Sequence, residues 1–241
     1  MDLKGSKKGI LYLLPTTLGE TEPLEVLPLT IKQAVEGIDH YVVENEKSAR
    51  RFIKKITPRK SQAQLRIKLL NKYTEEHEIP EYLQPCMQGF SIGVLSEAGC
   101  PGIADPGALL VRMAHEKGIR VVPLVGPSSI ILALMASGLN GQNFAFNGYL
   151  PIESAARRKA IRELEKRSRE SGQTQLFMET PYRNNKLLAE LVRALRPDTR
   201  LCVAADLTLK TEYIQTLAIS EWSGVTVDLH KRPAIFAILA E

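Results

Sequence analysis

Three loops hold the residue types best suited to binding a small ligand, and each follows an apolar run typical of a strand. The first, Ser96–Gly107, has the sequence SEAGCPGIADPG. The second, at 126–129, is GPSS after VVPLV, and the third, Glu179–Arg183, is ETPYR after LFM. Ligands of open α/β sheets bind outside the carboxyl ends of the strands. These loops are therefore the first places to expect a site.

The first loop combines the most flexible residue type with the most rigid one. Gly99 and Gly102 permit a positive φ and a close approach of the backbone, whereas Pro101 stiffens the loop and has no N–H donor. Asp105 can cap the helix predicted after it, which is a purely structural role. That role does not explain AGCPG, so a ligand wall and an ordinary turn both stay open as interpretations.

The other two loops also have structural interpretations. Ser128 and Ser129 precede the apolar run ILALMA and suit the start of a capped helix. Arg183 can either pair with Glu179 or bind an anion. The sequence contains neither a Walker A loop nor a G-x-G-x-x-G pattern, so a phosphate cradle of the usual kind is not predicted.

Composition indicates a globular protein without a metal, a disulfide or a membrane span. The 241 residues are 44% hydrophobic, which is enough for a full core in one large or two small domains. The three cysteines and four histidines are scattered, so we expect no disulfide framework and no metal. The apolar run Ile10–Leu14 is too short for a signal peptide, and we expect a cytoplasmic protein with no membrane partner. The net charge of +5 fits a polyanionic partner such as RNA.

Strand-like and helix-like patterns alternate in the first part of the chain. Strands are predicted at Ile10–Leu14, His40–Glu44, Ser91–Ser96 and Arg120–Leu124. Helices are predicted at Thr30–Val35, Lys47–Ile56, Ser61–His77 (one helix or two), Gly107–Lys117 and Ser128–Ala136. Gly118 suits the position just after a helix end. This order predicts an α/β fold with a mostly parallel sheet covered on both faces.

The second part has shorter strands and fewer helices. Strands are predicted at Phe144–Tyr149, Gln175–Glu179, Leu201–Ala205, Thr211–Ala218 and Ala234–Leu239. Helices are predicted at Ala155–Arg169 and Asn184–Leu195. This pattern indicates a mixed sheet. The turn cluster LNGQN predicts a boundary between an N-terminal α/β domain, residues 1–141, and a C-terminal α/β domain, residues 142–241.

In their order along the chain, SEAGCPGIADPG, VVPLVGPSSIILALMASGL, FAFNGYLP and ETPYR resemble the tetrapyrrole-methylase-like (class III) S-adenosylmethionine methyltransferases. Within that group the sequence looks most like the ribosomal RNA small subunit methyltransferase I family, which methylates a ribose 2′-hydroxyl of 16S rRNA. The similarity is strong from Ser91 to Arg183 and weaker through VAADLTLKTEYIQTLAISEW. It implies two α/β domains with the cofactor cleft between them, S-adenosylmethionine as cofactor, and a homodimer.

Several motifs depart from the usual pattern of that family. The usual T-P-I-G-N after the first strand is replaced by PTTLGE at 15–20, and the usual E-D-T-R by ENEK at 44–47. The aspartate of S-D-A-G becomes Glu97, and S-P-H-R becomes TPYR at 180–183. The presumed cofactor loops match better than the presumed acceptor-facing ones. The resemblance therefore supports methyl transfer more strongly than it supports the rRNA target.

The resemblance also implies which residues contact the cofactor. They are Leu14, Pro15, Ala98, Gly99, Cys100, Pro101, Gly102, Ile103, Ser128, Ser129, Met178, Ala205, Pro233 and Ala234.

A ribose hydroxyl must lose its proton when it is methylated, so it needs a base or a path to solvent. The candidates for this catalytic role are Glu97, Glu44 and Glu179. Each of the three also suits a structural role in which it caps or pairs with a neighbour.

Basic residues are concentrated in the predicted helix Ala155–Arg169. The candidates for contact with RNA phosphates are Arg157, Arg158, Arg162 and Arg183. Glutamates in the same helix balance part of this charge, so a solvated helix face is the alternative.

Three functions remain open at this point. The main hypothesis is an S-adenosylmethionine-dependent methyltransferase acting on 16S rRNA in the small ribosomal subunit. The first alternative is a methyltransferase of the same fold acting on a tetrapyrrole or another small molecule. The second is a non-catalytic protein that binds the cofactor or RNA.

Overall fold

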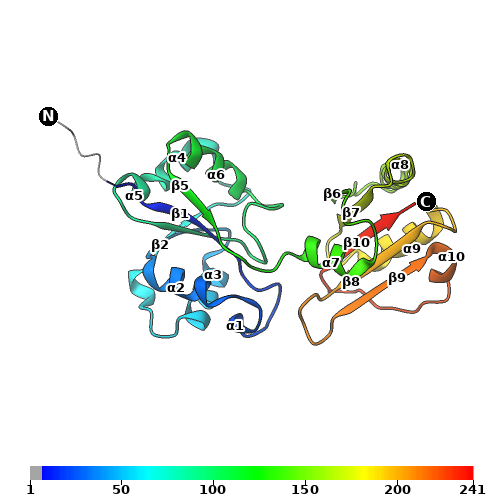
Figure 1. Cartoon of the computed structure of the whole chain (residues 1–241), viewed down its shortest axis with the longest axis horizontal. Helices are drawn as coiled ribbons and strands as arrows, with labels where there is room; N and C mark the ends of the chain where they lie inside the picture. Colours follow the sequence, from blue (N-terminus) through cyan, green and yellow to red (C-terminus); the bar gives the residue numbers. More distant parts are fainter. Residues whose placement is uncertain (1–6, 241) are drawn as a thin grey trace. The chain divides into compact units, whose positions relative to one another are not determined.

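A computed structural model describes residues 7–240, and the chain divides into two compact units, Met1–Ser128 and Ser129–Glu241. Each unit contains one sheet of five strands (Figure 1).

The first unit is built on a parallel sheet with the strand order β3-β2-β4-β1-β5. Its strands are β1 (Ile10–Leu14), β2 (His40–Val43), β3 (Arg66–Leu69), β4 (Ile92–Leu95) and β5 (Arg120–Pro123). Every pairing between them is parallel. Parallel strands need crossover connections, and those connections cover both faces of the sheet. The prediction of a mostly parallel sheet is confirmed.

Helices lie on both faces of this sheet, α1, α2 and α3 on one and α4, α5 and α6 on the other (Figure 1). Their bounds are α1 (Pro23–Val26), α2 (Leu29–Gly37), α3 (Glu46–Ile56), α4 (Ile79–Tyr82), α5 (Gln84–Met87) and α6 (Gly107–Glu116), with short 3₁₀ turns at Gln62–Gln64 and Glu76–Glu78. Alternation along β2 explains the two cores: Tyr41 and Val43 join the cluster under α2 and α3, whereas Val42 joins the cluster under α6. Gly118 has a φ of +60°, as its predicted place after a helix end requires.

The predicted helix or helices at Ser61–His77 are wrong. This stretch contains a 3₁₀ turn and then β3, which pairs with β2 as the edge strand of the sheet. Its side chains are mostly exposed, so it lacks the apolar alternation that marks a buried strand. Hydrogen bonding to the neighbouring strand overrides the helix-like local sequence here.

The second unit is built on a mixed sheet with the strand order β6-β7-β10-β8-β9. Its strands are β6 (Phe144–Tyr149), β7 (Thr174–Met178), β8 (Arg200–Ala205), β9 (Tyr213–Ala218) and β10 (Ala234–Leu239). Only the β6–β7 pair is parallel, while β10 runs antiparallel to both β7 and β8. The predicted mixed sheet is confirmed.

Four helices accompany this sheet: α7 (Ser129–Ser137), α8 (Ser154–Ser171), α9 (Asn184–Ala194) and α10 (Ile219–Trp222). α8, α9 and α10 bury Ile161, Leu191 and Trp222 against one face. α7 packs on β8, β9 and β10, and the Thr216 hydroxyl donates a hydrogen bond to the Ser137 carbonyl at 2.8 Å. Leu201 and Val203 of β8 point into the core under α8, α9 and α10, so Cys202 between them points to the other face of the sheet. Thr216 is opposite Cys202 and bonds to α7, so α7 covers that other face.

The packing of α7 also decides where the chain divides. The observed division precedes α7, whereas the predicted boundary at residues 141–142 follows it. The turn cluster at 139–143 marks the real end of a helix, but the apolar faces of that helix are buried in the second unit.

Candidate functional site

In the first unit, the loops after β1, β4 and β5 are tied together by hydrogen bonds. The Thr16 N–H donates to the Gly99 carbonyl at 2.9 Å, and the Ser96 hydroxyl donates to the same oxygen at 2.9 Å. The Cys100 thiol lies 3.4 Å from the Pro127 carbonyl oxygen. Because β1 lies between β4 and β5 in a parallel sheet, the carboxyl ends of these strands meet. Two of the three predicted loops therefore belong to one loop cluster.

Glycines are required where these loops touch. Gly99 has a φ of +74°, and a Cβ there would lie 3.1 Å from both Leu18 and the Pro127 carbonyl oxygen. A Cβ on Gly126 would lie 2.2 Å from the Cβ of Pro15, far too close for two carbon atoms that are not bonded to each other. The glycines thus allow close packing between the loops, which is one structural reason for glycine at these positions.

Gly102 differs because it faces open space. Its φ is +83°, and no heavy atom lies within 4 Å of the position of a Cβ. The Asp105 carboxylate accepts hydrogen bonds from the Gly102 N–H and from the N–H of Gly107, the first residue of α6, each at 2.8 Å. The N-cap of α6 is Pro106, so Asp105 binds the first residue of the helix from the position before the cap and also holds Gly102 in place.

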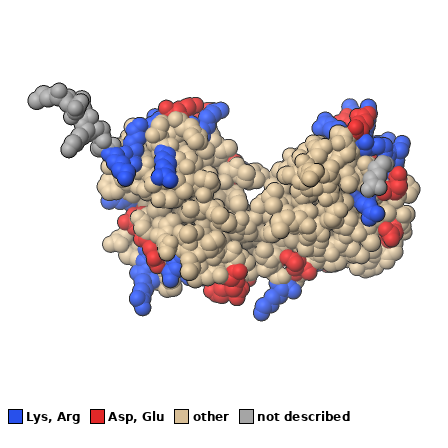
Figure 2. Space-filling model, viewed as in Figure 1, with Lys and Arg blue, Asp and Glu red and all other residues tan. Residues whose placement is uncertain are grey.

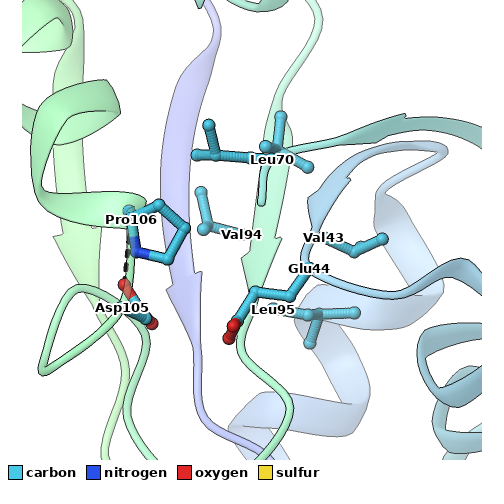
Figure 3. A pocket seen from close by; sticks show the side chains of 9 residues that line it. Val43, Glu44, Leu70, Val94, Leu95, Asp105 and Pro106 are labelled. Carbon is cyan, nitrogen blue, oxygen red and sulfur yellow. Dashed lines mark hydrogen bonds between the residues drawn. The ribbon is translucent and has the colours of Figure 1, made fainter. Parts of the chain in front are cut away.

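Two of the three candidate proton acceptors lie together beside this loop. The Glu97 N–H donates to a Glu44 carboxylate oxygen at 3.0 Å, and the Ser48 hydroxyl donates to the Glu97 carboxylate. Glu44 and Asp105 border a small hollow, also lined by Leu70 and Leu95, with a volume of about 10 Å³ (Figure 3). That volume has room for about one water molecule.

The electrostatics of the hollow favour protonation. Burial raises the pKa of the Glu44 carboxyl, the hydrogen bond from the Glu97 N–H opposes this shift, and the charges of Asp105 and Glu97 add to it. Burial likewise raises the pKa of Asp105, against the hydrogen bonds from Gly107 and Gly102. Glu44 is therefore a stronger proton acceptor than an ordinary glutamate.

Glu179, the third candidate, is held in an ion pair in the second unit. Its carboxylate is 2.6 Å from the Arg183 guanidinium and accepts the Thr180 N–H at 2.7 Å. Burial opposes ionisation, but these hydrogen bonds outweigh it, so the pKa of Glu179 is lowered. Glu179 is thus a weaker base than an ordinary glutamate. Arg183 was expected either to pair with Glu179 or to bind an anion, and the structure shows the pairing.

Four of the five candidate cofactor residues of the second unit meet at one end of its sheet, namely Met178, Ala205, Pro233 and Ala234. β10 lies between β7 and β8, with Ile235 opposite Met178 and Ala234 opposite Ala205. The Asp206 N–H donates to the Pro233 carbonyl at 2.9 Å. These residues, far apart in sequence, therefore form one group.

Burial limits what some of these candidates can offer a ligand. The side chains of Leu14 and Ala205 are fully buried in the cores of their units, so only their backbone atoms can face a ligand. Ile103, in contrast, is 55% exposed beside the open Gly102. Ala98 is also exposed, and Pro15, Gly99 and Pro101 are buried.

One cluster beside this group was not foreseen from the sequence. Asp206 has a φ of +52°, and its carboxylate accepts hydrogen bonds from Arg232 at 2.7 Å and from the Thr211 hydroxyl at 2.9 Å. Arg232 also donates to the Thr211 carbonyl. The cluster joins the segment after β8 to the segment before β10. No local pattern connects these residues, because their pairing exists only in the folded sheet.

The basic residues of α8 divide into buried and exposed members. The predicted RNA contact Arg157 is only 2% exposed, because its guanidinium pairs with Glu190 at 2.5 Å and 2.6 Å and donates to the Ile152 carbonyl. The structure therefore places Arg157 in the interior instead of on an RNA-facing surface. Arg158 and Arg162 are exposed and border a shallow hollow with Lys159 and Lys166. Figure 2 shows this charged surface over α8, with acidic side chains among the basic ones.

Residues 7–240 contain neither a metal-binding cluster nor a membrane-spanning helix. No group of three or more His, Cys, Asp or Glu side chains in this range is arranged to hold a metal ion. No helix in the same range is both long and apolar enough to cross a membrane.

Comparison with known proteins places this chain in a family. A family model described as tetrapyrrole (corrin/porphyrin) methylases matches residues 27–222, most of both units. The chain belongs to the tetrapyrrole methylase family. The resemblance of the loop motifs is therefore confirmed.

The relatives of this tetrapyrrole methylase among curated proteins include several named ribosomal RNA small subunit methyltransferase I. The Vibrio cholerae protein is 31% identical over 88% of this chain and 69% of its own length. The Escherichia coli O157:H7 protein is 30% identical over 98% of this chain and 79% of its own. The Bacillus subtilis protein is 32% identical over 91% of this chain and 70% of its own.

Solved structures of similar fold include two methyltransferases. The methyltransferase CobJ is 15% identical, with a TM-score of 0.63 over 96% of this chain and 94% of its own. Uroporphyrin-III-C-methyltransferase from Thermus thermophilus is 18% identical, with a TM-score of 0.52 over 96% of this chain and 92% of its own. At these identities the likeness concerns the fold, and it confirms two α/β units of the tetrapyrrole methylase type.

This family member is an S-adenosylmethionine-dependent methyltransferase. Its residues fit the cofactor, because the loop after β4 leaves open space at Gly102 and presents an exposed apolar side chain at Ile103. A sulfonium-bearing nucleoside needs backbone partners and apolar walls of this kind more than a metal.

Proposed function

We propose that this tetrapyrrole methylase transfers a methyl group from S-adenosylmethionine to a ribose 2′-hydroxyl of 16S rRNA in the small ribosomal subunit. The observation that carries the proposal is the similarity to proteins named ribosomal RNA small subunit methyltransferase I, which in the Escherichia coli relative extends over 98% of this chain. The exposed basic residues of α8 and the net charge of +5 support an RNA substrate.

The proposed cofactor contacts form two groups, one in each unit. The first comprises Leu14, Pro15, Ala98, Gly99, Cys100, Pro101, Gly102, Ile103 and Ser128, and the second comprises Ser129, Met178, Ala205, Pro233 and Ala234. The open side at Gly102 and the meeting of Met178, Ala205 and Ala234 at one end of their sheet support this assignment. When bound, S-adenosylmethionine supplies a methyl group already activated on a sulfonium.

The work left to the protein is alignment and proton removal. Well-aligned reactants account for a large share of the rate enhancement in such transfers. We assign the removal of the ribose proton to Glu44, with Glu97 holding it through its N–H, because the pKa of Glu44 is raised whereas that of Glu179 is lowered. Glu179 instead orients Arg183.

Arg158 and Arg162 are the proposed phosphate contacts, since both are exposed on α8 beside Lys159 and Lys166. Arg183 remains a proposed contact through the part of its guanidinium not used by Glu179. We also propose that the protein is a homodimer located in the cytoplasm, and sedimentation of the purified protein tests the first of these points.

A second candidate function follows from the family description, which names tetrapyrroles. In that case the same fold methylates a tetrapyrrole or another small molecule. A third candidate, a non-catalytic protein that binds the cofactor or RNA, is motivated by the altered sequences at 15–20 and 44–47.

One assay separates these candidates. Purified protein is incubated with methyl-labelled S-adenosylmethionine and either small ribosomal subunits lacking 2′-O-methylation or uroporphyrinogen. The proposal is supported if 16S rRNA becomes labelled and its backbone resists alkaline cleavage at the one labelled nucleotide. Label in the porphyrin alone supports the second candidate, and cofactor binding with no label in either substrate supports the third.

A further inference from the structure

Two tyrosines on the second unit expose their rings next to the proposed cofactor end of its sheet. Tyr149 is 59% exposed and Tyr182 is 70% exposed. Tyr149, the last residue of β6, is in register with Met178, the last residue of β7. Tyr182 lies in the loop that follows β7. Tyr149 therefore lies beside the start of the segment from Met178 to Arg183, and Tyr182 lies within that segment.

The backbone that carries Tyr182 is held firmly. The Lys231 N–H donates to the Pro181 carbonyl at 3.0 Å, and the Arg183 N–H donates to the Thr180 carbonyl at 2.9 Å. The His230 ring meets the Tyr182 ring edge-on, with centroids 5.9 Å apart and planes at 71°. A rigid loop with an exposed ring loses little freedom when a flat ligand stacks on it.

The surroundings are charged rather than apolar. Glu179 pairs with Arg183 and Asp206 pairs with Arg232, whereas Lys231 is exposed and belongs to no ion pair among the described residues. Arg183 and Lys231 belong to the two segments that hold Tyr182, and Arg232 follows directly. Aromatic rings among cations bind single-stranded nucleic acid, because bases stack on the rings while the cations meet the phosphates. A protein partner would require a larger continuous apolar surface.

We propose that Tyr149 and Tyr182 form a stacking platform that holds an unpaired rRNA nucleotide beside the proposed cofactor residues of the second unit. This inference rests on the proposed function and names the residues that select the substrate form. Sequence-specific recognition of RNA depends mostly on unstacked bases in loops and bulges, which aromatic side chains can hold. The platform therefore makes the enzyme act on a non-helical segment of the rRNA.

The first test uses Tyr149→Ala, Tyr182→Ala and Tyr182→Phe. Loss of one stacked base weakens nucleic-acid binding by roughly 5- to 150-fold. We expect each alanine variant to raise KM for the small subunit within that range, and Tyr182→Phe to keep the wild-type value, because stacking needs the ring and not the hydroxyl. Calorimetric affinity for S-adenosylmethionine should stay unchanged in all three.

Tyr73→Ala is the matched control. Tyr73 is 78% exposed on the first unit, so its removal deletes an equally accessible tyrosine at a distant place in the sequence. Its KM should equal that of the wild type. Alanine variants of Tyr149 and Tyr182 that methylate RNA with wild-type KM would overturn the platform, whereas a wild-type enzyme that methylates no RNA would overturn the proposed function.

A second test reports stacking without turnover. The only tryptophan in the sequence, Trp222, is 3% exposed, so Tyr182→Trp adds one accessible reporter. A single-stranded oligonucleotide with the sequence of the methylated rRNA segment should quench its fluorescence, and the same segment in a perfect duplex should not. Equal quenching by both, or none by either, contradicts the platform.

Discussion

At the residue scale, the chemistry depends on a few side chains whose neighbours alter their properties. Burial raises the pKa of Glu44, while hydrogen bonds lower that of Glu179 despite its burial. Two glutamates that look equivalent in sequence therefore differ: Glu44 is the stronger proton acceptor and the proposed base, whereas Glu179 is an ion-paired anion. Environment, not residue type, assigns the roles.

Gly102 provides the sharpest test of the cofactor site at this scale. Gly102→Trp should weaken S-adenosylmethionine binding by at least about tenfold, because the indole would fill the open side of the loop. Gly172→Trp is the control, since Gly172 also combines a positive φ with open space but lies at the end of α8. Calorimetry measures both affinities, and circular dichroism checks the fold. Equal affinities in the two variants would argue against Gly102 lining the cofactor.

The Asp206–Arg232 pair should stabilise the segments that carry Ala205 and Pro233. Removing one partner of a largely buried pair leaves the other without its hydrogen bonds, at a cost of about 1–3 kcal/mol. A double-mutant cycle with Asp206→Asn and Arg232→Met should therefore show a coupling energy of this size in urea unfolding. Asparagine is chosen because it tolerates the positive φ of Asp206. Additive effects of the two changes would mean that the pair contributes no stability.

At the element scale, each sheet brings distant segments to one edge. In the first unit, parallel strands place the loops after β1, β4 and β5 together, and glycines let those loops touch. In the second unit, antiparallel β10 places its first residue beside the last residue of β8 and its second residue beside the last residue of β7. Strand direction is thus what assembles both groups of proposed contacts.

The ion pair between α8 and α9 should make stability depend on pH. The hydrogen bond from Arg157 lowers the pKa of Glu190 below its ordinary value of 4.5, with burial opposing. The resulting stabilisation is present above pH 4.5 and is lost as the pH falls through the lower pKa of the folded state. The difference in unfolding free energy between wild type and Glu190→Gln should therefore shrink as the pH falls below 4.5.

Chemical denaturation across this pH range measures the effect, and Glu170→Gln is the control. Glu170 lies on α8 in an exposed pair with Lys166 at 3.7 Å, which is worth little. A gap for Glu190→Gln that stays constant down to pH 3 would show that Arg157 does not favour the ionised carboxylate.

At the scale of the whole molecule, charge distribution should govern binding to RNA. Each lost phosphate contact reduces the slope of log affinity against log salt by about 0.7 for single strands. Arg158→Gln/Arg162→Gln should thus weaken rRNA binding at low salt and flatten this slope by about 1–2. Filter binding at several salt concentrations measures it.

Lys32→Gln/Arg112→Gln removes the same net charge from the first unit and serves as the control. Both of its residues are exposed and lie on other helices. Equal losses in the two double variants would mean that overall charge, rather than α8, attracts the RNA.

Much of the fold could be predicted because short-range patterns carry it. Ile10–Leu14, Phe144–Tyr149 and Ala234–Leu239 form strands with the predicted bounds, since apolar runs of this length next to turn residues are compatible with few other structures. The exposed edge strand β3 was missed because its sequence lacks apolar alternation. Its hydrogen bonds to the neighbouring strand β2 stabilise it instead. The loops of the candidate site were found from their glycines and prolines.

The amino-acid sequence thus established the family through the resemblance of its loop motifs. It also established the α/β class and the loops that carry the proposed cofactor contacts, because backbone sterics and apolar periodicity act over neighbouring residues. Tertiary structure was needed to show that Arg157 is buried against Glu190, that α7 belongs to the second unit, and that Glu44 lies beside Asp105. Each of these depends on a partner far along the chain. Burial and charge pairing are set by such partners, and they decide which side chains can meet a substrate.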